Sequence, residues 1–219
     1  MLQQRYRKDY SGEYVILSTL FRDGRKMQQR EWVPNRIINQ HVSGRAVVLC
    51  GSQPLGTYEV SRLAKHKGGL LASKKLQIYG INSVWKTVAC EFLVCHDQDE
   101  IEKIVESGYS DRCVIYTNPP NLMKYPDNFY LVPYSPAGLS TPATAMYLAA
   151  FDGHKEVFVL NFNDATDKEA RQAITVVQAY QSTQFIFVSE HSDPRPSAMK
   201  DLSNCQFMNL RQWVTHCDV

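Results

Sequence analysis

From Arg45 onward, short apolar runs alternate with segments that have the periodicity of amphipathic helices, and this alternation most constrains the fold. The apolar runs predict buried strands at Ala46–Cys50, Leu76–Asn82, Phe92–Cys95, Cys113–Tyr116, Phe129–Val132, Glu156–Asn161 and Phe185–Ser189. The intervening segments predict helices at Thr57–Lys67, Asp99–Ser107, Ala143–Phe151 and Asp167–Gln181. This order favours an α/β, Rossmann-like fold, with an open, mostly parallel sheet and helices on both faces.

The first 43 residues have the pattern of a β-hairpin instead. Glu13–Phe21 is rich in β-branched and aromatic residues, and Met27–Trp32 is the expected returning strand. The Asp23-Gly24 pair between them is a strong signal for a tight hairpin turn. An isolated hairpin is marginally stable in water, so we expect residues 13–33 to lie against the main body or against another chain.

These patterns divide the chain into three parts. We predict an N-terminal β-hairpin arm at residues 1–43, a Rossmann-like domain at 44–193, and an irregular C-terminal segment at 194–219 that packs on the domain. With 219 residues, of which 44% are hydrophobic, the chain is long enough for one domain with a buried core.

Charge and hydropathy argue against several classes of protein. The longest apolar runs have about seven residues, against roughly 20 for a membrane-spanning helix, so we expect no membrane partner. The polar N-terminus Met1–Tyr10 lacks the apolar core of a signal peptide, which predicts a cytoplasmic location. A formal net charge of +2 argues against nucleic acid as a partner. The six cysteines contain no CxxC pair and are expected to be buried thiols.

Two glycine-bearing turns are the most informative local features for function. Gly51-Ser52-Gln53-Pro54 follows the first buried strand, and Gly138-Leu139-Ser140-Thr141 precedes the helix expected at Ala143–Phe151. Backbone N–H groups in such turns point toward bound anions, and the helix dipole adds to the attraction. Two such turns predict a cleft for a phosphorylated ligand. The alternative is that Gly51 only forms a tight turn and Ser140 only caps a helix.

Polar residues follow several of the predicted strands. In open parallel sheets, ligands bind beyond the carboxyl ends of the strands, near the point where the strand order reverses. The polar strand-end residues are Gly51, Ser52, Gln53, Asn82, Ser83, His96, Asp97, Thr117, Asn118, Ser135, Asn161, Asn163 and Asp164. Loops are polar in most proteins, which explains each position alone but explains the combination less well.

Four of these features, in this order, resemble those of a known family. Gly51-Ser52-Gln53-Pro54-Leu55 is similar to the glycine turn of the motility-associated glycosyltransferase-like proteins, a family shared with archaeal 6-hydroxymethylpterin diphosphokinases. Strands ending in Asn82 and Asp97 match its second and third features. The fourth is Gly138–Thr141 followed by Ala149–Leu160, which is also similar to bacterial sialyltransferases that use CMP-sialic acid.

The resemblance covers residues 44–165 and implies a protein that binds a nucleotide or nucleotide-sugar and transfers a glycosyl or diphosphoryl group. The chain departs from the pattern at four places, and one of them is Thr141, which stands where the sialyltransferases have glycine. Gln53 stands where the group has a second glycine, and Leu55 stands where it often has serine. The catalytic histidine of the sialyltransferases has no match within residues 165–190, so His191 is the nearest candidate.

A nucleotide ligand predicts roles for the residues of both turns and of the strand ends. The candidate nucleotide-binding residues are Gly51, Ser52, Gln53, Asn82, Asn118, Gly138, Ser140, Thr141, Asn161 and Asp164. Asp97 and Asp164 are candidate Mg²⁺ ligands, and each also stands where a helix cap is expected. His96, Asp97 and His191 are candidate catalytic residues, since a histidine titrates near neutral pH.

The sequence therefore supports two functions of different classes. The first is a transferase in which positioning and stabilisation of the leaving phosphate supply most of the catalysis. The second is a non-catalytic structural or interaction protein, of phage origin and acting in the host cytoplasm, that has kept the fold. In that case residues 13–33 would serve assembly into a homo-oligomer, or binding of a partner, by strand addition.

Overall fold

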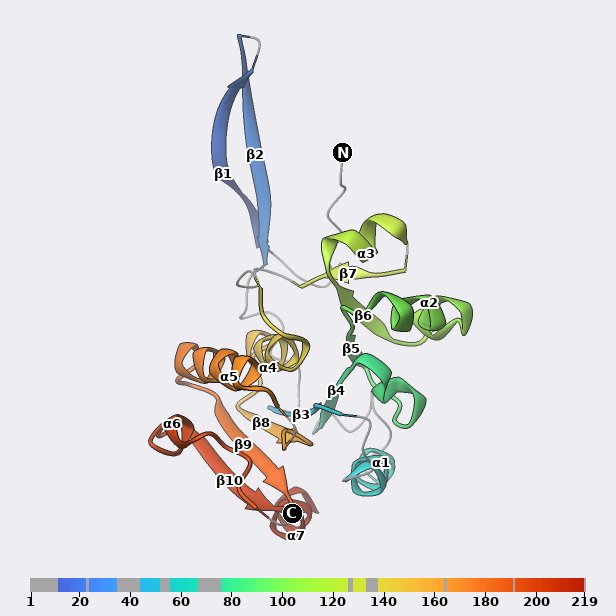
Figure 1. Ribbon diagram of the computed structural model, residues 1–219, viewed down its shortest axis with the longest axis vertical. Coiled ribbons are helices and arrows are strands. Elements are labelled where there is room, and N and C mark those ends of the chain that lie inside the picture. The colour runs from blue at the N-terminus through green and yellow to red at the C-terminus, as the bar shows by residue number, and fades with distance from the viewer. Residues whose placement is uncertain are drawn as a thin grey trace.

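The computed structural model describes residues 12–22, 24–34, 44–51, 56–66, 76–125, 128–132, 138–163, 165–190 and 192–218. Over these residues the backbone forms an eight-stranded, all-parallel sheet with helices packed on it, and a separate two-stranded sheet (Figure 1). The predicted α/β, Rossmann-like fold is confirmed.

The large sheet has the strand order β10-β9-β8-β3-β4-β5-β6-β7. Its strands are β3 (Arg45–Leu49), β4 (Gln77–Ile81), β5 (Phe92–Val94), β6 (Val114–Thr117), β7 (Tyr130–Leu131), β8 (Glu156–Leu160), β9 (Gln184–Ser189) and β10 (Cys205–Asn209). The helices are α1 (Thr57–His66), α2 (Gln98–Glu106), α3 (Pro119–Lys124), α4 (Thr141–Phe151), α5 (Asp167–Ala179), α6 (Ser197–Lys200) and α7 (Leu210–Asp218). Two short 3₁₀ helices are η2 (Asn82–Lys86) and η3 (Tyr109–Asp111).

The strand order reverses between β3 and β8. From β3 the chain moves outward through β4, β5, β6 and β7, returns through α4 to β8 on the other side of β3, and continues to β9 and β10. Leu49, the last residue of β3, is in register with Leu160 of β8 and with Gly80 of β4. Because the strands are parallel, their carboxyl ends share one edge, and the reversal opens a space there.

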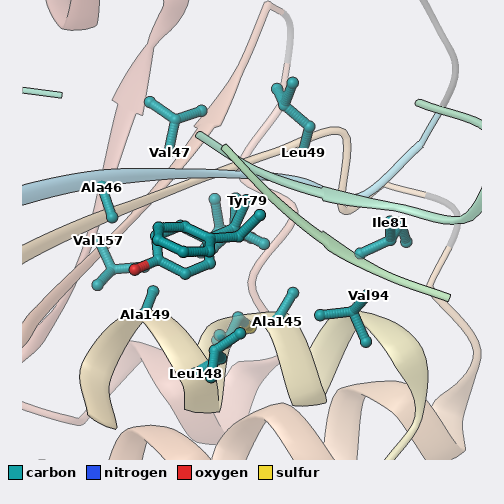
Figure 2. Packing of buried hydrophobic residues seen from close by; sticks show 14 of the residues in the cluster. Ala46, Val47, Leu49, Tyr79, Ile81, Val94, Ala145, Leu148, Ala149 and Val157 are labelled. Atoms are coloured by element: carbon teal, nitrogen blue, oxygen red, sulfur yellow. The ribbon is translucent and has the colours of Figure 1, made fainter. Parts of the chain in front are cut away.

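Helix α4 lies buried between the sheet and α5. Ten of its eleven residues are buried, because the helix is apolar on all sides rather than on one stripe. In Figure 2, Ala145, Leu148 and Ala149 of α4 pack against the face of the sheet that carries Tyr79 and Ile81. Small side chains on α4 allow this close approach, which fixes the position of the start of the helix relative to the strand ends.

The opposite face of the sheet is covered by α7, which contacts β9 and β10, and by α1, which contacts α7 (Figure 1). Trp213 of α7 is fully buried, and its ring meets Phe158 of β8 edge-on at 6.0 Å. Helices therefore cover both faces, as predicted.

The prediction that residues 194–219 are irregular is wrong, because they contain α6, β10 and α7. Strand β10 pairs in parallel with β9. It is short and carries the polar residues Gln206 and Asn209, so the sequence lacks the continuous apolar run that predicts a buried strand. Trp213 and Cys217 are four residues apart and both buried, which is the helical spacing of α7 that the sequence interpretation overlooked.

The hairpin predicted at residues 13–33 is present as β1 (Gly12–Arg22) and β2 (Arg25–Pro34), which pair antiparallel. Gly24 has a φ of 72°, as tight hairpin turns require, and Asp23 lies outside the described residues. Figure 1 shows the hairpin extending away from the large sheet. None of the helices in the described residues is long and apolar enough to cross a membrane.

Candidate functional site

A pocket of about 200 Å³ lies at the carboxyl edge of the sheet, where the strand order reverses. The ends of β3, β4 and β8 and the starts of α4 and α5 form its walls. Its lining residues are Cys50, Gly51, Ile81, Asn82, Thr141, Pro142, Asn161, Phe162, Ala165 and Glu169. Four residues predicted to bind a nucleotide, Gly51, Asn82, Thr141 and Asn161, therefore lie around one pocket.

The ends of β3 and β8 are joined at the base of the pocket. The backbone N–H of Cys50 donates to the carbonyl of Leu160 at 2.9 Å, and the Asn161 amide donates to the Gly51 carbonyl at 3.4 Å. A Cβ at Gly51 would lie 3.7 Å from the Cβ of Asn161, an ordinary contact. Packing therefore does not require a glycine at position 51. The missing side chain leaves the pocket open.

Asn82 and Asn161 share an unusual backbone conformation. Their φ angles are 43° and 61°, and among the described residues they are the two non-glycine residues with positive φ. Asparagine tolerates this region better than most residues, yet such conformations concentrate where a site holds the backbone in place. Both lie at a strand end and both line the pocket.

Two buried polar atoms near the pocket lack hydrogen-bond partners within the described structure, Asn82 Oδ1 and Ser140 Oγ. Leaving a buried acceptor unsatisfied costs about 1–3 kcal/mol. Ser140 occupies the N-cap position of α4, but its side chain makes no capping hydrogen bond. The alternative prediction that Ser140 only caps a helix therefore does not account for its hydroxyl group.

The turn before α4 is held by a residue that the sequence interpretation missed. Gln172 of α5 accepts from the backbone N–H of Ser140 at 2.8 Å and donates to the carbonyl of Gly138 at 2.6 Å. Gly138 has a φ of 80° and is exposed outside the pocket lining, so it shapes the turn rather than the wall. The sequence gives no signal for this role, because Gln172 is 34 positions from Gly138.

The electrostatics of the pocket combine one acidic side chain with the starts of two helices. Glu169 lies in the first turn of α5, where its carboxylate accepts from the backbone N–H and the hydroxyl of Thr166, both at 2.8 Å. Burial, with a smaller effect of Glu169, raises the pKa of Cys50 well above its usual range, so this thiol stays protonated. The described lining contains no basic side chain, so the N-terminal dipoles of α4 and α5 are its sources of positive potential.

His96, Asp97 and Asn118 lie at the same edge of the sheet, after β5 and β6, but they do not line the pocket. Asp97 caps α2 by accepting from the backbone N–H of Glu100 at 2.9 Å. Asn118 caps α3 in the same way, through the N–H of Asn121 at 3.1 Å. Asp97 therefore has the capping role that was the alternative to binding a metal ion, whereas the capping role of Asn118 was not predicted.

His96 is half-buried, and burial lowers the pKa of its imidazole, which keeps the ring neutral near pH 7. Within the described ranges, no group of three or more His, Cys, Asp or Glu side chains could hold a metal ion. Ser52, Gln53, Asp164 and His191 lie outside the residues that the structure describes.

Comparison of the chain with protein-family models, with curated proteins and with solved structures gave no match. The likeness of residues 44–165 to the glycosyltransferase-like family therefore stays a prediction.

Proposed function

We propose that this pocket binds a nucleotide or nucleotide-sugar and that the protein is a transferase of glycosyl or diphosphoryl groups. The observation that carries the proposal is the convergence of Gly51, Asn82, Thr141 and Asn161 on one pocket. The pocket lies where the strand order reverses, which is the position at which open parallel α/β sheets bind their ligands.

The polar groups of the pocket suit different parts of such a ligand. A phosphate would sit at the start of α4, near Thr141, where the helix dipole favours negative charge. Asn82 Oδ1 is an unsatisfied acceptor, which suits a hydroxyl of the ribose or the sugar. A volume of about 200 Å³ is below the roughly 300–1,000 Å³ of whole-ligand sites, so the pocket would hold one part of the ligand.

Catalysis in this proposal depends on positioning and on stabilisation of the leaving phosphate. The protonated thiol of Cys50 is a poor nucleophile, which argues against a covalent intermediate at this wall of the pocket. The neutral imidazole of His96 would suit a general base if the ligand extends along the sheet edge toward β5. A diphosphate would bring Mg²⁺ with it. Of the two predicted ligands, Asp97 caps α2 outside the pocket, so Asp164 stays the candidate.

The test is a thermal-unfolding titration with CMP, UDP and ATP, each with and without Mg²⁺. A ligand that binds only the folded state at 100 times its Kd stabilises by about 2.7 kcal/mol. We expect at least one nucleotide to raise the Tm, and Asn82→Gly, which removes the amide but permits the backbone conformation, to abolish the increase.

The matched control is Asn163→Gly, because Asn163 is exposed and lies outside the pocket lining. It should respond to nucleotide like the original chain. Failure of all three nucleotides to raise the Tm would contradict the proposal, as would an undiminished response of Asn82→Gly.

A second candidate function is assembly through the N-terminal arm. The observation that favours it is that β1 and β2 form their own sheet apart from the eight-stranded one. Two-stranded sheets are marginally stable alone, and a strand edge offers backbone groups to another chain. Deletion of residues 1–40 should lower the oligomeric mass measured by light scattering; an unchanged mass and an unchanged Tm would count against an assembly arm.

A further inference from the structure

A second and larger concavity lies on the α1/α7 side of the same sheet edge. We name it the α1–α7 groove. Its volume is about 650 Å³, within the roughly 300–1,000 Å³ range of small-molecule sites. The residues that line it are Tyr58, Glu59, Arg62, Glu190, Asn209, Leu210, Arg211 and Val214.

The start of α7, which lines the groove, packs closely against the turn before α1. A Cβ at Gly56 would lie 2.7 Å from Cδ2 of Leu160 and 3.5 Å from Cδ1 of Leu210. The backbone of Gly56 is therefore wedged between the end of β8 and the start of α7. Leu210 lines the groove, whereas the next residue after Leu160, Asn161, lines the pocket. The two cavities share no lining residue and are distinct sites.

Tyr58 gives the groove an aromatic platform. Tyr58 is 74% exposed, and among the residues whose exposure the structure describes only Met123 is a comparably exposed large hydrophobic residue. Tyr58 and Arg62 are four residues apart on α1, so they face the groove from adjacent turns of one helix. An exposed ring with a charged neighbour suits a ligand that has apolar faces and a polar rim.

The charged side chains of the groove balance one another. Glu59 and Glu190 supply carboxylates, and Arg62 and Arg211 supply guanidinium groups. The carboxylates would repel a phosphate, and the guanidinium groups would repel a cation. A hydroxyl group both donates and accepts hydrogen bonds, so it can pair with either kind of side chain, and such charge-assisted hydrogen bonds are strong.

The α7 wall of the groove is held in place before any ligand binds. The backbone N–H of Asn209 donates to the Gln212 side chain at 2.9 Å, and the N–H of Gln212 donates to the Asn209 side chain at 2.9 Å. Leu210 and Val214, one turn apart on this helix, add aliphatic surface beside the polar rim. A preorganised wall lowers the entropy lost on binding.

We infer that the α1–α7 groove binds a neutral, polyhydroxylated ligand, that is, a saccharide. A sugar ring carries C–H groups on its faces, which match the ring of Tyr58, and hydroxyl groups at its rim, which match Glu59, Glu190, Arg62 and Arg211. This inference does not rest on nucleotide binding, because the groove and the pocket share no lining residue.

The test is saturation-transfer NMR on the full chain with the methyl glycosides of glucose, galactose, mannose and N-acetylglucosamine. We expect transfer to at least one glycoside and at least fivefold weaker binding of it by Tyr58→Ala. Because Tyr58 is 74% exposed, this variant should keep the original Tm. Glu59→Gln, which keeps the side-chain shape and removes the charge, should also weaken binding.

Two matched controls keep the result interpretable. Met123→Ala removes an exposed apolar side chain outside the groove, and Asn82→Gly alters only the pocket. Both should bind the glycoside like the original chain. Absence of transfer to all four glycosides would overturn the inference, as would transfer that survives in Tyr58→Ala, or displacement of the glycoside by inorganic phosphate or by a nucleoside. Glycoside binding without any nucleotide response would contradict the proposed function and leave this inference intact.

Discussion

The hydroxyl group of Tyr79 donates a 2.8 Å hydrogen bond to the carboxylate of Asp152, and both residues are fully buried. Tyr79 lies in the middle of β4, and Asp152 ends α4. The Nε2 atom of His154 lies 3.1 Å from the same hydroxyl group and 2.9 Å from Oε1 of Gln77. This network fastens the end of α4 to the sheet, while Gln172 holds the turn at its start, so the helix is fixed beside the pocket at both ends.

Tyr79→Phe should lower the free energy of unfolding by about 1–3 kcal/mol, because it removes the hydrogen bond donated to the buried carboxylate of Asp152. Urea denaturation measures the change. Tyr58→Phe is the matched control, since the exposed Tyr58 ring should lose its hydroxyl without effect on stability. Equal stability of the two variants would show that the Tyr79–Asp152 hydrogen bond does not stabilise the fold.

Glu91 should make stability fall as the pH rises. Burial raises the pKa of its carboxyl group from 4.5 to about 7, and one of its oxygens, Oε1, has no hydrogen-bond partner within the described structure. Between about pH 4.5 and pH 7 the folded state then binds more protons than the unfolded state, so this group's contribution to stability declines with rising pH. Over the whole window the decline is on the order of 3 kcal/mol.

Glu91→Gln isolates this contribution. The other oxygen of Glu91 accepts from the backbone N–H of Ile78 at 2.7 Å, and the glutamine carbonyl can keep that hydrogen bond. The variant should exceed the original chain in stability at pH 8 and should lose the decline. The lowered pKa of His96 acts in the opposite direction and is present in both proteins, so it cancels in the difference. Glu106→Gln, which removes a carboxylate from an exposed position of α2, is the matched control, and the decline due to Glu91 should persist in it.

Gly80→Ala should destabilise the sheet by about 1–3 kcal/mol, as overpacking of a close-packed core does. A Cβ at Gly80 would lie 2.6 Å from Sγ of Cys90. Adding Cys90→Ala to this variant should recover part of the loss, because it removes the clashing atom. Gly51→Ala should change stability by no more than about 0.5 kcal/mol. Failure of Cys90→Ala to recover any stability would refute this explanation.

Asn161→Ala should be less stable than Asn161→Gly by about 1 kcal/mol, because an alanine is strained at a φ of 61°. Both variants lack the amide side chain, so the difference between their unfolding free energies reports the strain of the left-handed conformation less the extra entropy that a glycine loses on folding. Denaturant titrations of the two proteins measure it. Equal stabilities would mean that the left-handed conformation relaxes when the side chain is removed.

The strands of the domain could be predicted closely, because strands buried on both faces are continuous apolar runs in the sequence. Arg45–Leu49 and Glu156–Leu160 lie within one residue of the predicted ends. Strand β10 was missed because an edge strand is only partly buried, and Cys205–Asn209 therefore mixes apolar and polar residues. Helix α3 was missed because six residues carry too short a periodic pattern.

The candidate site was likewise predicted in part and missed in part. The strand-end rule, that ligands bind beyond the carboxyl ends of parallel strands, identified Gly51, Asn82 and Asn161. This rule needs only the position at which each apolar run stops. The same rule also selected Asp97 and Asn118, which are helix caps outside the pocket. The Thr166–Glu169 capping box begins α5, but nothing in its spacing indicates that Glu169 lines the pocket.

The sequence alone determined the alternation of strands and helices and the polar residues at each strand end, because local periodicity records which side chains are buried. Only the tertiary structure decided which of those ends meet. Gly51 and Asn161 are 110 positions apart and become neighbours because the chain returns to place β8 beside β3. That choice of neighbour is made by the packing of α4 between the sheet and α5, and long-range packing of this kind leaves no periodic signal in the sequence.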